Sequence, residues 1–157
     1  MSYFCKKKNK MSKVALYCHI VFCTKGREMS ISLQYKEDLY RYIWSVLKDS
    51  STDLIRIGGI QNHIHMLINI PPTVTLSKLM QNVKSLSSGW MSTDLRYKNF
   101  KGWARGYFAC SVSPDRVDDV RRYIINQEMH HLGHNFSDEL DGLYRHAGIE
   151  PDERDMI

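Results

Sequence analysis

The stretch QNHIHMLINIPP, residues 61–72, decides the fold because every second residue from Ile64 to Ile70 is apolar and two histidines flank the first of them. Neighbouring side chains of a β-strand point to opposite faces, so His63 and His65 leave one face together. The residues that leave the other face, toward a core, are Ile64, Met66, Ile68 and Ile70. Two prolines, residues 71–72, end the strand because proline cannot donate a hydrogen bond to a sheet.

Segments on both sides of this strand have the periodicity of regular structure. They are a strand at 14–23, a helix at 34–49, a strand at 54–60, a helix at 75–90, a strand at 107–113 and a helix from Ser113 to about His131. Only Gln61 and Asn62 join the strand at 54–60 to the next one, which predicts an antiparallel hairpin. The order predicts an α+β fold of the ferredoxin-like or RRM-like type, β-α-β-β-α-β, with a four-stranded antiparallel sheet and an extra C-terminal helix. The last helix is expected to cover the second face of the sheet.

Length and charge indicate one domain with two distinctive ends. The 157 residues suit a single core, and we expect a flexible basic arm at 1–13, a folded body at 14–136 and an acidic tail at 137–157 that is helical over 137–146. Residues 1–136 contain 20 Lys and Arg against 10 Asp and Glu, whereas residues 137–157 contain 2 against 7. A basic body favours a polyanionic partner such as nucleic acid, although charge alone equally fits a merely soluble basic protein.

Several classes of protein are excluded by composition. No apolar run approaches the roughly 18 residues of a membrane span, and the N-terminus lacks the apolar stretch of a secretory signal, so a cytoplasmic location is expected. The cysteines show no CxxC spacing, which argues against a zinc knuckle or a disulfide framework. They are Cys5, Cys18, Cys23 and Cys110.

The histidine pair is a candidate metal site. Two imidazoles on one side of a strand suit one ion, yet two surface histidines on a half-buried strand would give the same pattern. Tyr123 and Gln127 are four residues apart in the last helix and therefore share one side of it. Taken singly, Tyr123 is more typical of an aromatic residue packed against the sheet, and for Gln127 the alternative is a solvated helix residue.

Together His63, His65, Gln127 and Tyr123 indicate metal-assisted attack of a tyrosine on a phosphate. Two nitrogens and an amide oxygen leave coordination positions open for water and phosphate, which suits Mg²⁺ or Mn²⁺ better than a structural zinc. Such an ion polarises a phosphate while Tyr123 supplies the attacking oxygen. The product is a phosphotyrosine ester, which keeps the energy of the broken bond for rejoining.

Three motifs carry a resemblance to a known family: QNHIHMLINIPP, WARGYF at 103–108 and YIINQEMHH at 123–131. In order and rough spacing they resemble the single-tyrosine HUH-superfamily transposases of small bacterial insertion sequences. The resemblance covers about Val14 to Gly148. It implies an HUH transposase domain in which His63 and His65 are the HUH pair, Tyr123 is the nucleophile and Gln127 the third metal ligand.

The resemblance also implies an activity and partners. Relatives bind hairpin ends and cleave and rejoin single-stranded DNA through a 5′-phosphotyrosine intermediate. They form homodimers in which the tyrosine helix docks in cis or in trans, and the sequence does not choose between the two. Asn62 departs from the aspartate expected in many relatives and puts the orientation of the histidine pair in doubt.

Candidate DNA contacts follow from positive charge near the strand end and on the helices, with solvated side chains as the alternative. They are His19, Lys25, Arg27, Lys78, Lys84 and Arg116. Rival functions are a non-catalytic module that stacks bases on Tyr17 and Tyr107, and a domesticated, repeat-associated HUH nuclease. A relaxase or replication initiator is disfavoured by the small size and the single candidate tyrosine.

Overall fold

Four strands form one antiparallel sheet in the computed structural model, which describes residues 12–130, 132–152 and 154. They are β1 (Tyr17–Cys23), β2 (Asp53–Ile60), β3 (His63–Asn69) and β4 (Phe108–Val112). Their spatial order is β2-β3-β1-β4, which makes β1 and β3 the central strands. The order and the antiparallel pairing confirm the predicted ferredoxin-like α+β fold.

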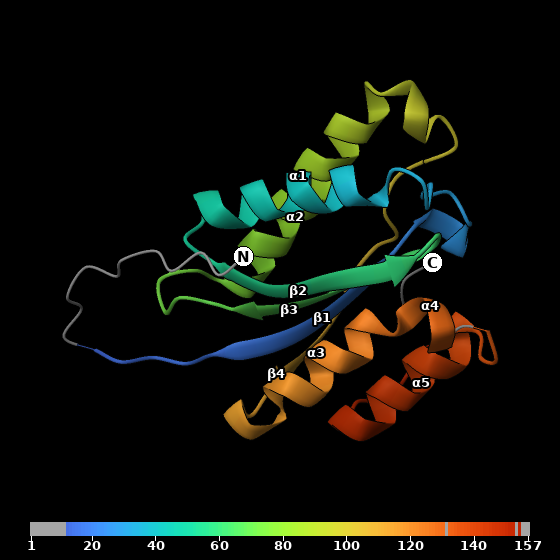
Figure 1. Ribbon diagram of the computed structural model, residues 1–157. Helices are drawn as coiled ribbons and strands as arrows, with labels where there is room; N and C mark the ends of the chain where they lie inside the picture. Colours follow the sequence, from blue (N-terminus) through green and yellow to red (C-terminus); the bar gives the residue numbers. More distant parts are fainter. Residues whose placement is uncertain (1–11, 131, 153, 155–157) are drawn as a thin grey trace.

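Helices cover both faces of the sheet (Figure 1). The five α-helices are α1 (Lys36–Asp49), α2 (Leu76–Ser92), α3 (Val117–Ile125), α4 (Gln127–His130) and α5 (Phe136–Ala147), and short 3-10 turns lie at Lys25–Arg27, Leu95–Tyr97 and Pro114–Arg116. α1 and α2 lie on one face, and α3, α4 and α5 lie on the other. Within the described residues, none of these helices has the length and apolar character needed to cross a bilayer.

The face under α1 and α2 is the larger apolar core. Ile64, Met66 and Ile68 point into it from β3, as the alternation predicts, and all three are fully buried. Ile20 and Phe22 join them from β1. Burying such side chains stabilises the fold by roughly 1.5–3 kcal/mol each, before the cost of ordering the chain.

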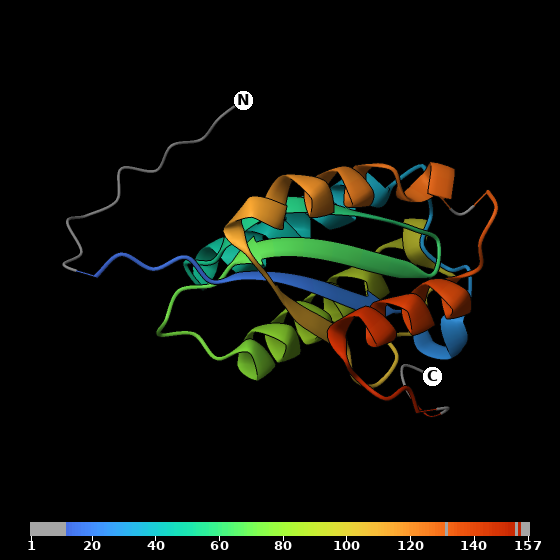
Figure 2. The same ribbon diagram turned by 90° about the horizontal axis from the view of Figure 1, so that it is seen from below.

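The opposite face has a smaller core, formed largely by α5. Phe136, Leu140 and Tyr144 of this helix pack with Val21 of β1 and Phe108 of β4. In Figure 2, α3 and α5 cross this same face of the sheet. The helix expected at 137–146 is therefore one residue longer at each end, and it packs against the body.

Two boundaries differ from the sequence prediction for local reasons. The first strand begins at Tyr17 rather than at Val14, because Tyr17 already pairs with Asn69, the last residue of β3. The last predicted helix is divided into a 3-10 turn, α3 and α4, with Asn126 between the last two at φ −91° and ψ 13°. His131, the expected end of that helix, lies outside the described residues.

Most of the expected basic arm at 1–13 also lies outside the described part of the chain, which begins at residue 12. In the acidic tail, residues 153 and 155–157 are likewise outside it.

Candidate active site

The histidine pair lies in the interior, on the central strand β3. His63 and His65 stand opposite Cys23 and Val21 of β1, and both imidazoles are fully buried. Their ring centroids are 5.0 Å apart. The alternative of two surface histidines is therefore excluded, and the pair faces the side covered by α3 to α5.

Asn62 orients the first histidine. Its Nδ2 donates to the Arg27 carbonyl (3.3 Å), and its Oδ1 lies 2.7 Å from His63 Nδ1. An amide oxygen only accepts, so Nδ1 of His63 carries a proton and Nε2 faces the site. Asparagine thus orients the ring through an acceptor oxygen, as a carboxylate would.

His19 orients the second histidine from β1. Its Nε2 lies 2.9 Å from His65 Nδ1, and the two rings stack with centroids 5.1 Å apart. Burial, and then the neighbouring His65, lower the pKa of His19 to about 3. His19 is therefore neutral and only 6% exposed, so it lies beneath the site instead of presenting its ring to solvent for a DNA contact.

Glu139 of α5 completes a polar cluster, and the sequence pattern does not predict this residue as part of the site. Its Oε2 lies 3.4 Å from His63 Nε2 and its Oε1 lies 3.3 Å from His65 Nε2. Burial raises the pKa of Glu139, but the neighbouring imidazoles of His63 and His65, and then the Tyr123 hydroxyl, outweigh it and hold this pKa well below its ordinary value. The carboxylate is ionised in a buried position.

Tyr123 projects from α3 toward the same point. Its hydroxyl donates a hydrogen bond to Glu139 Oε1, and its ring centroid lies 5.6 Å from that of His65. Burial, and then Glu139, raise the pKa of Tyr123 above its ordinary value, so the phenol is protonated at rest. The tyrosine helix lies against β2 and β3 of its own chain.

Gln127, the first residue of α4, lies between the histidine and the glutamate. Its Oε1 is 3.2 Å from His63 Nε2, and its Nε2 donates to Glu139 Oε1 at 3.0 Å. The side chain is 1% exposed. Despite the irregular backbone at Asn126, Tyr123 and Gln127 reach the same cluster, as their four-residue spacing predicts.

A glycine in β2 lets the tyrosine helix approach the sheet. A Cβ built on Gly58 would lie 2.7 Å from the backbone oxygen of Ile124, next to Tyr123 in α3. That separation is too short for a side chain at this position, so the absence of a Cβ sets the depth of α3 on the sheet.

The donor atoms suit a divalent cation. Ligands at about 2.1 Å from an octahedral ion are about 3.0 Å apart when adjacent, close to the 3.2 Å between His63 Nε2 and Gln127 Oε1. His63 and His65 present Nε2 to the site, while their Nδ1 atoms are held by Asn62 and His19. Such outer partners are typical of metal-binding histidines.

A cavity of about 310 Å³ gives access to this cluster. Tyr123 and Glu139 line it, together with His130, His134 and Leu143. The His130 ring lies 5.5 Å from the Tyr123 ring and 5.2 Å from the His134 ring, measured between centroids. The nucleophile candidate and the buried carboxylate therefore both border this cavity.

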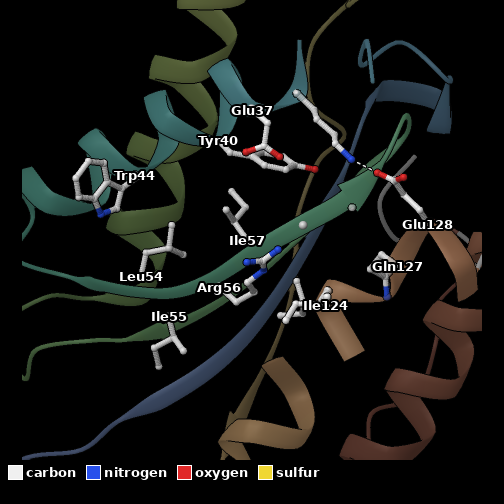
Figure 3. A pocket seen from close by; sticks show the side chains of 14 residues that line it. Glu37, Tyr40, Trp44, Leu54, Ile55, Arg56, Ile57, Ile124, Gln127 and Glu128 are labelled. Atoms are coloured by element: carbon white, nitrogen blue, oxygen red, sulfur yellow. Dashed lines mark hydrogen bonds and ion pairs between the residues drawn. The ribbon is translucent and has the colours of Figure 1, made fainter. Parts of the chain in front are cut away.

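A second hollow, of about 300 Å³, lies at the outer edge of β2 (Figure 3). Leu54, Ile57 and Ile124 line it, and Lys36 of α1 pairs with Glu128 of α4 across it. Among the residues that the structure describes, no histidine borders this hollow, and we place no chemistry there.

The remaining DNA-contact candidates are spread over the surface. Lys84 is half-buried and donates to the carbonyls of Ala104 and Gly106 (2.7 and 2.8 Å), so it ties α2 to the loop before β4. Lys78 contacts Gln81 and Arg116 pairs with Asp119. Lys25 and Arg27 lie in the 3-10 turn after β1, on the loop whose carbonyl receives Asn62.

The buried histidine pair, with the tyrosine helix packed beside it, fits the arrangement that the sequence resemblance implies. A family model described as "Transposase IS200 like" matches residues 12–127. The chain therefore belongs to the IS200-like transposase family. The transposase of insertion sequence IS200 from Salmonella typhimurium is 26% identical over 114 residues, which cover 69% of this chain and 74% of that protein.

Solved structures show the same fold. A proposed transposase from Deinococcus radiodurans R1 superposes with a TM-score of 0.60 at 18% identity, covering 77% of this chain and 97% of that one. A REP-associated tyrosine transposase bound to a REP hairpin gives a TM-score of 0.57 at 15% identity, covering 82% and 74%.

Proposed function

We propose that this transposase binds hairpin-bearing single-stranded DNA and cleaves and rejoins it through a covalent 5′-phosphotyrosine on Tyr123. One observation carries the proposal: within one chain, the Tyr123 hydroxyl is held at the carboxylate that contacts both His63 and His65. A packed aromatic residue needs no such cluster around its hydroxyl. The similar fold of a hairpin-bound tyrosine transposase supports the choice of DNA.

The residues of this chain have separate tasks in that reaction. The Tyr123 oxygen attacks phosphorus, the bond from phosphorus to the 3′ oxygen breaks, and the released 3′ oxygen takes a proton from solvent. The phenolic proton leaves toward Glu139, which already accepts its hydrogen bond. Rejoining reverses these steps, so that a 3′ hydroxyl displaces the tyrosine and the phenol regains its proton.

A divalent ion, Mg²⁺ or Mn²⁺, belongs to the proposal. His63, His65 and Gln127 would hold it, and when bound it supplies positive charge that polarises the phosphate and favours the phenoxide. His63 and His65 keep the orientation that this task requires through Asn62 and His19.

DNA positioning is assigned to three exposed cations and the half-buried Arg27. We propose Lys25, Arg27, Lys78 and Arg116 as phosphate contacts, and we assign His19 and Lys84 to structural roles because of their buried or backbone-bonded positions. The cytoplasmic location stays a prediction.

The test is formation of a protein–DNA adduct. Wild type with Mn²⁺ and a labelled single strand from the flanks of the element should give an adduct that survives denaturation. Tyr123→Phe should bind the hairpin equally well and form at least about a thousandfold less adduct, because only the attacking oxygen is lost. Undiminished adduct from this variant would remove Tyr123 as nucleophile.

The same assay tests the cis site. The resemblance implies a homodimer, and we propose that each subunit keeps its own complete site. A mixture of Tyr123→Phe with His65→Ala should then form no more adduct than either variant alone. Recovery of adduct in the mixture would mean that one subunit supplies the tyrosine and its partner the histidines.

A further inference from the structure

Glu139 differs from every other carboxylate of the described residues because it alone is buried, at 7% exposure. The groups around it are two imidazoles, a phenol and an amide. Burying an ionised carboxylate is costly unless positive charge faces it. The fold therefore places a negative group at a point that suits a cation.

The distances around Glu139 match metal coordination. One ligand atom each from His63, His65 and Glu139 can be chosen so that all lie within 4.8 Å of one another. Ligands of an octahedral ion at about 2.1–2.2 Å are about 3.0 Å apart when adjacent and about 4.3 Å when opposite. The contacts of 3.4 Å from Oε2 to His63 Nε2 and 3.3 Å from Oε1 to His65 Nε2 are slightly longer than the adjacent spacing.

The local sequence fixes Glu139 in this place. Asn135 caps α5 by accepting from the Asp138 backbone at 2.8 Å, and the Phe136 ring stacks on His63 with centroids 4.1 Å apart. Leu140, the next residue, is 2% exposed in the smaller core. The glutamate is therefore held on both sides by packed residues of its own helix.

We infer that Glu139 is a protein ligand of the divalent ion, bound through its carboxylate, whose Oε2 lies beside His63 and whose Oε1 lies beside His65. Oε1 also accepts from the Tyr123 hydroxyl, so one carboxylate links the nucleophile to the ion. A charged oxygen ligand strengthens the site for hard cations such as Mn²⁺ and Mg²⁺. Ion binding also fastens α5 to β3. The inference deepens the proposed function and rests on it for the identity of the site.

The experiment measures Mn²⁺ binding by the full-length protein without DNA, by calorimetry and by the electron paramagnetic resonance signal of free Mn²⁺. Glu139→Gln keeps the size of the side chain and removes its charge. Asp141→Asn, on the same helix, makes the same charge change away from the histidines and is the matched control. We expect Glu139→Gln to weaken Mn²⁺ binding at least about tenfold, and Asp141→Asn to change it less than about twofold.

Two further measurements separate a lost ligand from a lost fold. Urea unfolding in EDTA should show Glu139→Gln folded, and at saturating Mn²⁺ pulsed resonance should still detect nitrogen coupling from the histidines. If Glu139→Gln instead binds Mn²⁺ as tightly as wild type, or more tightly, the carboxylate is no ligand and the inference is overturned. That result leaves adduct formation through Tyr123 untouched, whereas a wild type that forms no adduct defeats the proposed function and leaves the Mn²⁺ comparison valid.

Discussion

The two faces of the sheet are built from alternate residues of the same strands, yet only one of them buries a cluster of polar side chains beside its apolar ones. Under α1 and α2, Ile64 and Met66 enter an apolar core. Under α3 to α5, His63 and His65 meet a glutamate, a glutamine and a tyrosine. Packing of the first kind stabilises a fold, whereas buried polar groups contribute little net stability and are retained for chemistry. Adjacent residues of β3 should therefore respond to substitution in different ways.

The largest difference between the two faces is expected from substitutions at two neighbouring residues of β3. His65→Ala should lower adduct formation about a thousandfold, because it removes a metal ligand, and His63→Ala and Gln127→Ala should weaken Mn²⁺ binding as well. Ile64→Ala should lower the free energy of unfolding by about 2–5 kcal/mol and leave Mn²⁺ binding of the folded protein nearly unchanged. Urea unfolding and Mn²⁺ titration of each variant decide the matter. Equal loss of both properties in both variants would mean that the faces are not separable.

The depth of α3 on the sheet gives a smaller effect. Gly58→Ala should push α3 away from β2 and displace Tyr123 from Glu139, which we expect to lower the adduct rate about 10- to 100-fold. Gly89→Ala is the control, since a Cβ at this position of α2 has no neighbour within 4 Å. Single-turnover kinetics at saturating DNA measure both. An unchanged rate for Gly58→Ala would show that the close approach of α3 has no part in catalysis.

Much of the fold follows from the sequence because periodicity reports which side of an element is buried. The alternation in β3 places its isoleucines in the core and its histidines on the other face, as the structure has them. Periodicity does not report where pairing ends, and so the sequence pattern predicts a first strand that begins at Val14, whereas pairing with β3 begins at Tyr17. It is equally insensitive to the break at Asn126, which lies within an apparently continuous helical pattern.

The site was predictable only where two residues lay close in the sequence. His63 with His65, and Tyr123 with Gln127, reveal themselves through a shared strand face or helix side. Glu139 contacts them from α5, and only the three-dimensional packing of that helix brings it near. The sequence does contain a sign that Glu139 is buried. Phe136 lies three residues before it and Leu143 four residues after it, so Glu139 shares the apolar side of the helix.

The smallest effect concerns the residue that departs from the expected pattern. Asn62→Ala should weaken Mn²⁺ binding about 10-fold, because His63 loses the oxygen that holds its Nδ1. Asn62→Asp keeps an acceptor there and should bind Mn²⁺ at least as tightly as wild type. Calorimetric titration of the two variants compares them directly. Loss of affinity in Asn62→Asp as large as in Asn62→Ala would mean that orientation of His63 does not depend on this oxygen.

The covalent link itself is the most direct test of the account. The adduct formed by wild type is digested with nuclease and trypsin, and mass spectrometry locates the remaining nucleotide. The tryptic peptide from Tyr123 to Arg145 also contains Tyr144, so fragment ions are needed to distinguish the two phenols. The account predicts a nucleotide joined through its 5′ phosphate to Tyr123, and attachment at Tyr144 or at any other residue would contradict it.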